Sequence, residues 1–322
     1  MISLQRSSVT RSPMALAPFL RLATLYASTG PSYAPACLGQ RDVVHWTKSR
    51  ESEVLHMKQA AFIGTGNMGG ALVRAACQSV PPQDVIISNR TRSKALDLEN
   101  DTGCTVAANN LEAACAARYL FLGVKPHMMR ALLEEIGPVL TPGQVLVSMA
   151  AGLTAETLAG WAPPGTPILR IMPNTPCSIG KGMIALCAGP NAQASHLQAV
   201  EHILRFAGRV ERLDEGLMDA FSAVAGCGPA FVYPFIEAMA DGGVLAGLPR
   251  QKAMAFAAQT LIGAACLVLE SEEHPGALKD AVCSPGGSTI EGVAALERGG
   301  FRGVVMDAVI AAWKKNTALG KQ

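Results

Sequence analysis

Short apolar runs separated by amphipathic segments dominate the chain from residue 58 to about residue 213. Five of these runs have the length and composition of buried strands: Lys58–Ile63, Val85–Ser88, Tyr119–Val124, Val145–Met149 and Ile168–Met172. Helical patterns, such as Met128–Ile136, lie between them. Alternating strands and helices with buried strands predict an α/β fold built on a parallel, doubly wound sheet.

The pattern continues with a strand, a helix and a strand at Met183–Cys187, Leu197–Phe206 and Arg209–Leu213, and then changes. Beyond Gly216 it predicts helices alone, rich in Ala and Gly: Phe221–Ala225, Ala230–Leu245, Arg250–Leu269, His274–Val282, Ser288–Leu296 and Phe301–Leu319. Several of these helices are apolar nearly all round. About 105 residues cannot bury so much apolar surface alone, so we expect a partner subunit to cover it.

Two stretches of this helical half, Ala220–Ile236 and Ala253–Leu269, contain no charged residue. Both are shorter than the roughly 20 residues that span a bilayer. One contains two prolines and the other contains the polar pair Gln259-Thr260. We interpret them as buried helices and expect no contact with a membrane.

Residues 1–56 differ from the rest of the chain. Arg6, Arg11 and Arg21 lie among Ser, Thr, Ala and Leu, and no acidic residue precedes Asp42. Such a composition is typical of an organelle-targeting presequence and predicts a mitochondrial protein, with a cytoplasmic one as the alternative. The competing interpretation is that translation starts at Met57 and the segment is never made. In either case we expect the fold to begin at Lys58.

A glycine-rich turn, Gly64-Thr65-Gly66-Asn67-Met68-Gly69, follows the first strand directly and precedes the helical run Ala71–Cys77. In that context the spacing predicts a dinucleotide-binding turn, because the glycines allow a tight turn, close approach of a pyrophosphate and packing of the helix. We therefore predict a Rossmann-type domain at 57–216 and an all-helical domain for substrate binding and dimerisation at 217–322.

The end of the second strand indicates which dinucleotide is bound. An acidic residue there would accept hydrogen bonds from a ribose 2′-hydroxyl, but the chain reads Asn89-Arg90-Thr91-Arg92-Ser93-Lys94. These side chains are donors suited to a 2′-phosphate, which favours NADP over NAD. The alternative is that they are ordinary surface charges after a strand.

Three further strand ends are candidate cofactor contacts, because cofactors on such sheets lie at the carboxyl ends of the strands. They are Val124-Lys125-Pro126, Met149-Ala150-Ala151-Gly152 and Met172-Pro173-Asn174-Thr175-Pro176. A proline after a strand more often marks only the end of the strand, so none of these three strand ends identifies a cofactor contact by itself.

The stretch Ser284–Thr289, reading SPGGST, pairs a glycine-rich turn with the start of an apolar helix. Unsatisfied N–H groups at a helix start can converge on a carboxylate or a phosphate. Ser288, followed three residues later by Glu291, fits a capping box, and the Thr289 hydroxyl is left to face a ligand. The alternative is a plain turn between helices.

Composition narrows the remaining possibilities. The net charge is +2 and only 16% of residues are charged, which argues against a nucleic-acid partner. The nine cysteines contain no C-x-x-C pair, as expected in a reducing compartment, and the six histidines form no ligand-spaced group with them. We therefore expect no metal site.

Taken together, these motifs resemble the pyrroline-5-carboxylate reductase family over residues 58–319. The resemblance is carried, in family order, by FIGTGNMGGAL, FLGVKPH, VSMAAG, MPNTP, GCGPAF, ADGGVLAGLPR, HPGALKDAVCSPGGST and LERGGFR. It implies reduction of 1-pyrroline-5-carboxylate to L-proline, the final step of proline biosynthesis, with NADPH as cofactor and NADH possible. It also implies a homodimer that assembles further, for example into a pentamer of dimers.

The resemblance assigns residues to both ligands. The implied cofactor contacts are Gly64, Gly66, Asn67, Met68, Asn89, Arg90, Thr91, Asn110, Val124, Lys125, Pro126, Met149 and Ala151. The implied substrate contacts are Ser284, Gly287, Ser288 and Thr289, with Thr289 as the catalytic residue. Cys227 and Ala281 depart from many relatives, and Ala281 removes a side chain that touches the nicotinamide in some of them.

The implied chemistry needs little from the protein. A protonated cyclic imine already accepts hydride, so holding the ring over the nicotinamide is the main task. Two alternatives stay open. One is a hydroxyacid dehydrogenase, which would need a catalytic lysine such as Lys252 or Lys279; the other is an NADP-sensing regulator without enzymatic activity.

Overall fold

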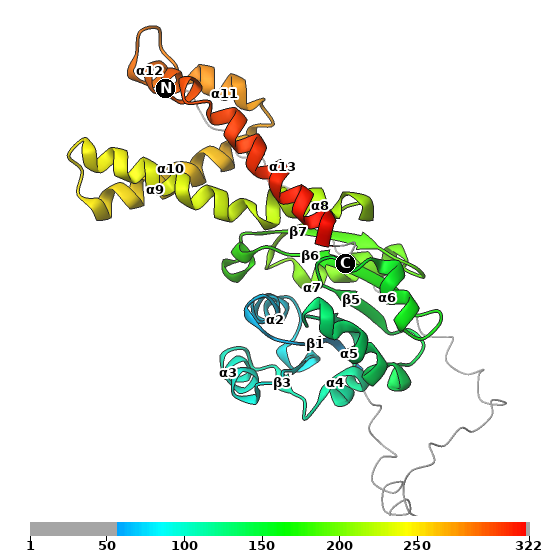
Figure 1. Ribbon diagram of the computed structural model, residues 1–322. Coiled ribbons are helices and arrows are strands. Elements are labelled where there is room, and N and C mark those ends of the chain that lie inside the picture. Colours follow the sequence, from blue (N-terminus) through cyan, green and yellow to red (C-terminus); the bar gives the residue numbers. More distant parts are fainter. Residues whose placement is uncertain (1–56, 320–322) are drawn as a thin grey trace, which may run out of the picture. The chain divides into compact units, whose positions relative to one another are not determined.

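The computed structural model describes residues 57–319, shown in colour in Figure 1. Residues 1–56, for which the sequence predicts targeting, lie outside the described residues. The described chain is built around an eight-stranded sheet in the order β3-β2-β1-β4-β5-β6-β7-β8. The strands are β1 (Lys58–Ile63), β2 (Val85–Ser88), β3 (Thr105–Val106), β4 (Ala117–Leu122), β5 (Val145–Ser148), β6 (Ile168–Met172), β7 (Gly182–Ala188) and β8 (Gly208–Arg212).

Helices cover both faces of this sheet (Figure 1). They are α2 (Asn67–Ser79), α3 (Arg92–Thr102), α4 (Asn110–Ala116), α5 (Met129–Ile136), α6 (Ala155–Trp161) and α7 (Ala194–Leu204). Ala60 and Phe62 of β1 belong to the core with α2 and α7, whereas Ala61 and Ile63 belong to the core with α4, α5 and α6. Because side chains alternate along a strand, a strand buried on both faces has to be apolar throughout.

The doubly wound sheet is confirmed, with two differences in detail. First, β7 runs antiparallel to β6, while every other neighbouring pair in the described sheet is parallel. The link between them, which contains the short helix η4 (Thr175–Ile179), is too short for the crossover that a parallel pair needs. Second, β3 was not predicted, because its two residues are too few for a hydrophobic pattern.

Helices alone follow β8. They are the short η5 (Glu215–Leu217), α8 (Met218–Phe221), a π-helical turn η6 (Ser222–Gly226), α9 (Gly228–Leu245), α10 (Arg250–Ser271), α11 (Pro275–Ala281), α12 (Ser288–Arg298) and α13 (Phe301–Leu319). In Figure 1, α9 and α10 run side by side, and α13 leads from α12 back to α8. The Asn316 side chain of α13 donates a hydrogen bond to the Asp219 carbonyl of α8 (3.3 Å). We call residues 215–319 the helical part.

The helices that the sequence predicts to be covered by a partner subunit are largely exposed in the single chain. Ala240, Ala253 and Ala257 form the one small buried cluster between α9 and α10 in the described residues. Large apolar side chains point outward: Ile262 is 57% exposed and Val304 is 65% exposed. Two stretches, Glu215–Leu245 and Arg250–Ser271, are long and apolar enough to cross a membrane. The chain alone therefore leaves a large apolar surface uncovered.

Polar contacts tie the start of the helical part to the sheet. Arg170 of β6, whose side chain is 7% exposed, forms an ion pair with Glu215 (2.6 Å). The same Glu215 carboxylate oxygen accepts the Ala155 N–H at the start of α6 (2.7 Å). A buried guanidinium needs such a partner, because an unpaired buried charge is strongly unfavourable. Glu215 thus links β6, α6 and η5 at one point.

Candidate functional site

The glycine turn after β1 has the geometry that a dinucleotide requires. Gly64 has φ +92°, which favours glycine, and its N–H donates to the Ser88 carbonyl at the end of β2 (2.8 Å). A Cβ on Gly69 would lie 2.4 Å from the Gly64 oxygen, so α2 approaches the turn as closely as backbone allows. A Cβ on Gly66 would meet nothing within 4 Å. The turn is therefore closely packed against α2 at Gly69, whereas the space beside Gly66 is open.

The start of α2 is free to bind an anion. Gly66 is the N-cap and offers no side chain, and the first turn holds no acidic residue. In the described chain, the N–H groups of Asn67 and Met68 make no hydrogen bond. Free N–H groups and the positive end of the helix dipole favour a phosphate at this position. The residues present therefore fit the pyrophosphate of a dinucleotide.

The predicted 2′-phosphate contacts lie on the exposed segment between β2 and α3. The Asn89 amide donates to the Thr91 carbonyl (3.0 Å), which shapes the turn. Arg90 is exposed and forms no ion pair with any described residue. A guanidinium without an internal partner remains available to a phosphate, with which it forms strong charge-assisted bonds.

Asn110, the first residue of α4, is held in place by its neighbours. Its Oδ1 accepts from the Ser88 hydroxyl at the end of β2 (2.7 Å), and its Nδ2 donates to Glu135 of α5 (3.0 Å). Both ends of the amide are engaged, so its plane is fixed beside the carboxyl end of β2. Asn110 thus joins the same edge of the sheet as Asn89, although 21 residues separate them.

The ends of β4 and β5 complete this edge. The Gly123 N–H donates to the Ile63 carbonyl (2.8 Å), and the Met149 N–H donates to the Leu122 carbonyl (3.2 Å), so the ladder continues one residue past each strand. Val124, Lys125 and Pro126 then lead into a short helix, η2 (Pro126–Met128), and Ala151 lies in an exposed turn. The cofactor residues that the family resemblance implies thus follow the carboxyl ends of the adjacent strands β1, β2, β4 and β5, except for Asn110, which follows β3 and contacts the end of β2.

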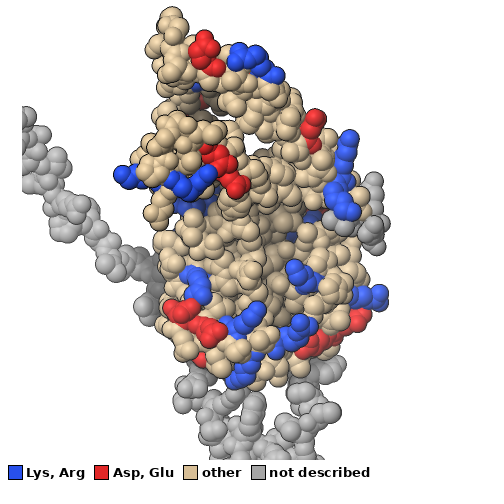
Figure 2. All heavy atoms as spheres, turned by 60° about the vertical axis from the view of Figure 1, so that its left-hand side comes forward, with Lys and Arg blue, Asp and Glu red and all other residues tan. Residues whose placement is uncertain are grey.

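This edge contains the point where the strand order reverses, between β1 and β4. Ligands of open α/β sheets bind at such a point, outside the carboxyl ends of the strands. On the face shown in Figure 2, positive and negative side chains are interspersed and most of the surface carries neither.

The SPGGST loop lies between α11 and α12 and is exposed. Gly286 has φ +66°, and the Gly287 N–H donates to the Ser284 carbonyl (3.0 Å), closing a tight turn. The predicted capping box is wrong: Gly287, not Ser288, is the N-cap of α12, and no side chain caps the helix. Ser288 and Glu291 are consequently one position too far into the helix for that pairing.

The loop nevertheless keeps free donors. The Gly287 N–H, which we expected to face a ligand, is used within the turn. The N–H groups of Ser288 and Thr289 have no partner among the described residues, and both side chains are exposed. Two adjacent N–H groups at the start of an eleven-residue helix form a place for a carboxylate.

The two groups of predicted residues do not meet in one chain. The SPGGST loop precedes α12, which packs on the first half of α13, and the other end of α13 contacts α8 beside the sheet. The nineteen residues of α13 span about 28 Å at 1.5 Å per residue. In Figure 1 the α11 and α12 helices lie at the end of α13 away from α8. In the single chain, the SPGGST loop therefore lies at the end of α13 that is far from the sheet.

Three of the described cysteines, Cys104, Cys177 and Cys187, are buried, whereas Cys115 and Cys266 are exposed. Burial raises the pKa of the Cys177 thiol, and it raises the pKa of the Cys187 thiol to about 11. Cys77 of α2 and Cys104, which lie 27 positions apart, are brought together; a hydrogen bond between their thiols lowers the pKa of Cys104 to about 7. In the part of the chain that the structure describes, no group of three or more His, Cys, Asp or Glu could hold a metal ion.

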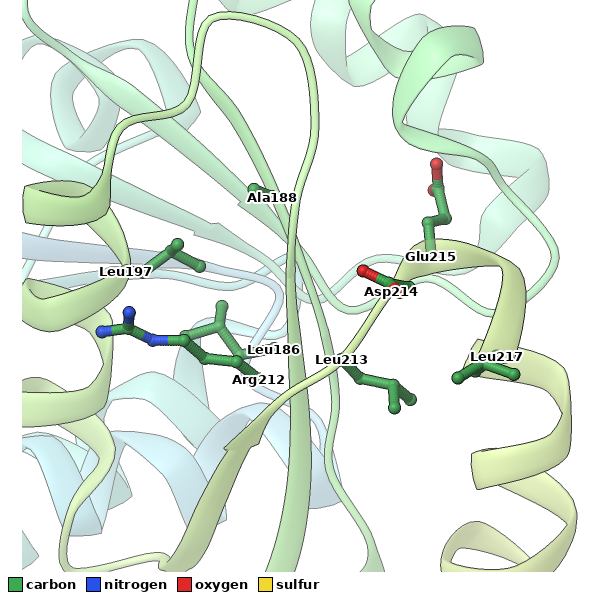
Figure 3. Close-up of a pocket in the computed structure, with 8 residues that line it drawn as sticks. All are labelled: Leu186, Ala188, Leu197, Arg212, Leu213, Asp214, Glu215 and Leu217. Atoms are coloured by element: carbon green, nitrogen blue, oxygen red, sulfur yellow. The ribbon is translucent and has the colours of Figure 1, made fainter.

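A pocket of about 410 Å³ lies elsewhere, between β7, β8, α7 and η5 (Figure 3). Its lining combines aliphatic and charged side chains: Leu186, Ala188, Leu197, Arg212, Leu213, Asp214, Glu215 and Leu217. Arg212 is committed to Glu201 of α7 through two hydrogen bonds (2.6 and 2.9 Å), and Glu215 to Arg170. The pocket includes none of the predicted cofactor or substrate residues.

Comparison with known proteins assigns the family. A family model for pyrroline-5-carboxylate reductase dimerisation matches residues 215–319, and one for NADP oxidoreductase, coenzyme F420-dependent, matches residues 59–152. Pyrroline-5-carboxylate reductase from Escherichia coli (strain K12) is 40% identical over 266 residues, 82% of this chain and 99% of that protein. The chain belongs to the pyrroline-5-carboxylate reductase family. The division at residue 216 stays a prediction.

Other members of this family agree. Pyrroline-5-carboxylate reductase 3 from Danio rerio is 39% identical over 277 residues, 85% of this chain and 96% of that protein. The Coxiella burnetii reductase structure has a TM-score of 0.77 at 29% identity, over 82% of this chain and 98% of that one. The Plasmodium falciparum reductase, solved with NADP bound, has a TM-score of 0.72 at 31% identity, with the same coverage.

Family membership decides against the hydroxyacid dehydrogenase alternative, and the two lysines give it no support. Lys279 forms an ion pair with the adjacent Asp280, and that hydrogen bond raises the lysine pKa, whereas a catalytic base needs a lowered one. Lys252 lies exposed on α10.

The contacts of Arg170, Glu215 and Asn174 with distant segments were not predicted from the sequence, because nothing in their spacing reveals a partner 45 or 51 residues away.

Proposed function

We propose that this chain reduces 1-pyrroline-5-carboxylate to L-proline with NADPH as the hydride donor. The observation that carries the proposal is the combination, in a member of this family, of an open dinucleotide turn at Gly66 and a helix start with free N–H groups at Ser288 and Thr289. The first suits a pyrophosphate and the second a small carboxylate. Bound NADPH would supply a hydride to the carbon of the protonated imine, whose nitrogen, already carrying its proton, would become the secondary amine.

The chain contributes binding and orientation to this reaction. The N–H groups of Ser288 and Thr289 hold the substrate carboxylate, with Ser284 and Gly287 shaping the loop. The Thr289 hydroxyl hydrogen-bonds the ring nitrogen, so two anchors fix which face of the ring is presented. Such positioning lowers the activation free energy, because the entropy cost of aligning the two reactants is met when they bind rather than in the reaction step.

Cofactor selection follows from the segment after β2. Arg90, which forms no ion pair with a residue in the range 57–319, pairs with the 2′-phosphate of NADPH, and Asn89 and Thr91 shape the turn that presents it. NADH lacks that phosphate and loses this contact, so it is the poorer donor. The remaining cofactor residues, from Gly64 to Ala151, line the edge of the sheet where the strand order reverses.

The assembly that carries out the reaction is a homodimer in which the helical part of one protomer supplies the substrate loop to its partner. The separation of loop and turn along α13 supports this arrangement. Assembly of dimers into a pentamer of dimers is our proposal for the larger oligomer. Mass photometry on the purified protein would distinguish a dimer from a decamer.

Residues 1–56 are proposed to direct the protein to mitochondria, with the cytoplasm as the alternative. Their arginines and lack of early acidic residues support the proposal. The segment fused to a fluorescent protein should reach mitochondria, and a diffuse cytosolic signal would rule targeting out. Deleting residues 1–56 should leave folding and turnover unchanged.

The function is tested by following NADPH oxidation with 1-pyrroline-5-carboxylate and identifying proline as the product. We expect turnover with this substrate and none with 2-hydroxy or 2-oxo acids. Binding of NADPH without oxidation in the presence of any cyclic imine would instead indicate a sensor. Oxidation with a 2-oxo acid alone would indicate a dehydrogenase.

A further inference from the structure

A buried asparagine lies where the sheet meets the helical part. Asn174 follows the end of β6 and is 8% exposed. Its Oδ1 accepts the Met183 N–H of β7 (2.9 Å), and its Nδ2 donates to the Ala225 carbonyl (2.9 Å), 51 residues further along the chain. One side chain therefore connects β6, β7 and the π-helical turn η6.

The Ala225 carbonyl depends on that donor. In an α-helix it would accept the N–H of residue 229, but residue 229 is a proline and has none. The neighbouring donors are used elsewhere: Cys227 N–H reaches the Ser222 carbonyl (2.9 Å), and Ala230 N–H reaches the Cys227 carbonyl (2.9 Å). Asn174 thus supplies the hydrogen bond that the helix lacks at the point where its geometry changes from π to α.

The position of this bond gives it a mechanical consequence. Helix α9 starts at Gly228, directly after the turn, and packs along α10, so the turn sets the direction in which both helices leave the sheet. Before the turn, the ion pair between Arg170 and Glu215 holds η5, and Met218 and Phe221 of α8 pack with residues of β6 and β7. At η6 itself, the Asn174 side chain supplies a hydrogen bond that joins the turn to the end of β6.

We propose that Asn174 is a positioning residue for hydride transfer. It holds η6 against the carboxyl end of β6 and thereby sets where the helical part, with its partner's substrate loop, lies relative to the nicotinamide. This inference rests on the proposed function. Hydride transfer requires the reacting atoms to be about 3 to 3.5 Å apart, and a displacement of about 1 Å can cost about a hundredfold in rate.

A matched control variant distinguishes a purely structural role of Asn174 from a role in positioning the substrate and the cofactor. Gln144, 2% exposed, also satisfies backbone carbonyls that lie far away in the sequence, those of Ala114 and Ala117 (2.6 Å each). All of its partners belong to the dinucleotide-binding part. Gln144→Ala should therefore lower the melting temperature without affecting the alignment of substrate and cofactor.

The test compares Asn174→Ala, Gln144→Ala and the unchanged protein as full-length chains. For Asn174→Ala we expect kcat to fall ten- to a hundredfold, the NADPH Kd to stay within about twofold, and the deuterium isotope effect with 4-deuterated NADPH to increase because hydride transfer becomes limiting. Gln144→Ala should lower the melting temperature at least as much and keep kcat and the isotope effect.

Asn174→Asp adds a readout that a structural role would not move. As a carboxylate it repels the Ala225 carbonyl, but once protonated it offers an O–H to Ala225 and a carbonyl to Met183 N–H, as the amide does. The ratio of its kcat to that of the unchanged protein should rise as pH falls from about 8 to about 5. Cys177, whose thiol contacts Asn174 Oδ1 (3.9 Å), has a pKa raised by burial and stays protonated in this range; Asn174→Ala controls for it.

Hydrogen exchange of residues 222–230 gives an answer independent of activity. In Asn174→Ala these amides should exchange faster, while those of β1 and β4 stay protected. Faster exchange together with unchanged kcat and isotope effect would overturn the positioning role, and so would unchanged exchange. If the unchanged protein does not reduce 1-pyrroline-5-carboxylate, the proposed function fails, while exchange still reports whether Asn174 holds the turn.

Discussion

Two groups of single residues are proposed to contact the ligands: Asn89 to Thr91 after β2, and Thr289 at the start of α12. Both were predicted from residue type and spacing alone, and both stay predictions. The capping at Ser288 could not be predicted correctly in this way, because a helix start depends on the backbone of the preceding turn, which begins α12 one residue earlier than a capping box at Ser288 requires. The roles of Asn174 and Glu215 depend on partners distant in the sequence and were not predictable.

Arg90 should set the preference for NADPH over NADH. Replacing it with Asp removes a charge-assisted contact worth about 1.5 to 3 kcal/mol and adds repulsion of the 2′-phosphate. We expect the NADPH Kd to rise at least tenfold and the NADH Kd to change little, measured by fluorescence titration. Equal losses for both cofactors would contradict the assignment.

Thr289 should act through its hydroxyl. Thr289→Val keeps the β-branched shape and removes the hydrogen bond to the ring nitrogen, so the fold should survive. Turnover should drop by about ten- to a thousandfold, since a positioned hydrogen bond in a dry site tightens toward the transition state. NADPH affinity should stay the same. Turnover and substrate affinity equal to those of the unchanged protein would show that the loop seats only the carboxylate.

At the scale of elements, the strands were easier to predict than their directions. Strands β1, β2 and β6 have the predicted bounds, because a buried strand has to be apolar along its whole length. The direction of β7 follows instead from a link too short for a crossover, which no hydrophobic pattern encodes. The strand ends that carry the proposed cofactor residues were predictable for the same reason as the strands, whereas the cofactor contacts themselves stay predictions.

The turn between β1 and α2 offers a matched pair of glycines. Gly66→Ala places a methyl group in open space, so the melting temperature should stay unchanged while NADPH affinity falls at least tenfold, because the methyl group occupies the place of the pyrophosphate. Gly69→Ala would press a Cβ to within 2.4 Å of the Gly64 oxygen. It should destabilise the fold by about 1 to 3 kcal/mol. Equal effects of both changes on thermal unfolding would contradict this account.

At the scale of the whole molecule, the apolar helical part explains why this chain needs a partner. The sequence showed more apolar surface than one chain can bury and predicted that a partner subunit covers it. The structure shows the surface exposed in the single chain. A dimerisation match over residues 215–319 explains it without a membrane.

A charge on that surface should break the dimer. Ile262 of α10 is 57% exposed, and burying a lysine in its place against a second chain is costly. We expect Ile262→Lys to run as a monomer by light scattering at micromolar concentration and to lose turnover. Leu96→Lys on α3, 39% exposed, is the control and should keep the dimer. A monomeric Ile262→Lys with full activity would contradict a shared site.

The length of α13 between the substrate loop and the sheet has a genetic consequence. If each active centre combines the glycine turn of one chain with the substrate loop of the other, two inactive variants can complement each other and restore activity. Gly66→Ala and Thr289→Val chains, co-expressed in a proline auxotroph, form heterodimers in which one centre carries both defects and the other carries neither. Random pairing leaves about a quarter of all centres intact, enough to rescue growth that neither allele supports alone.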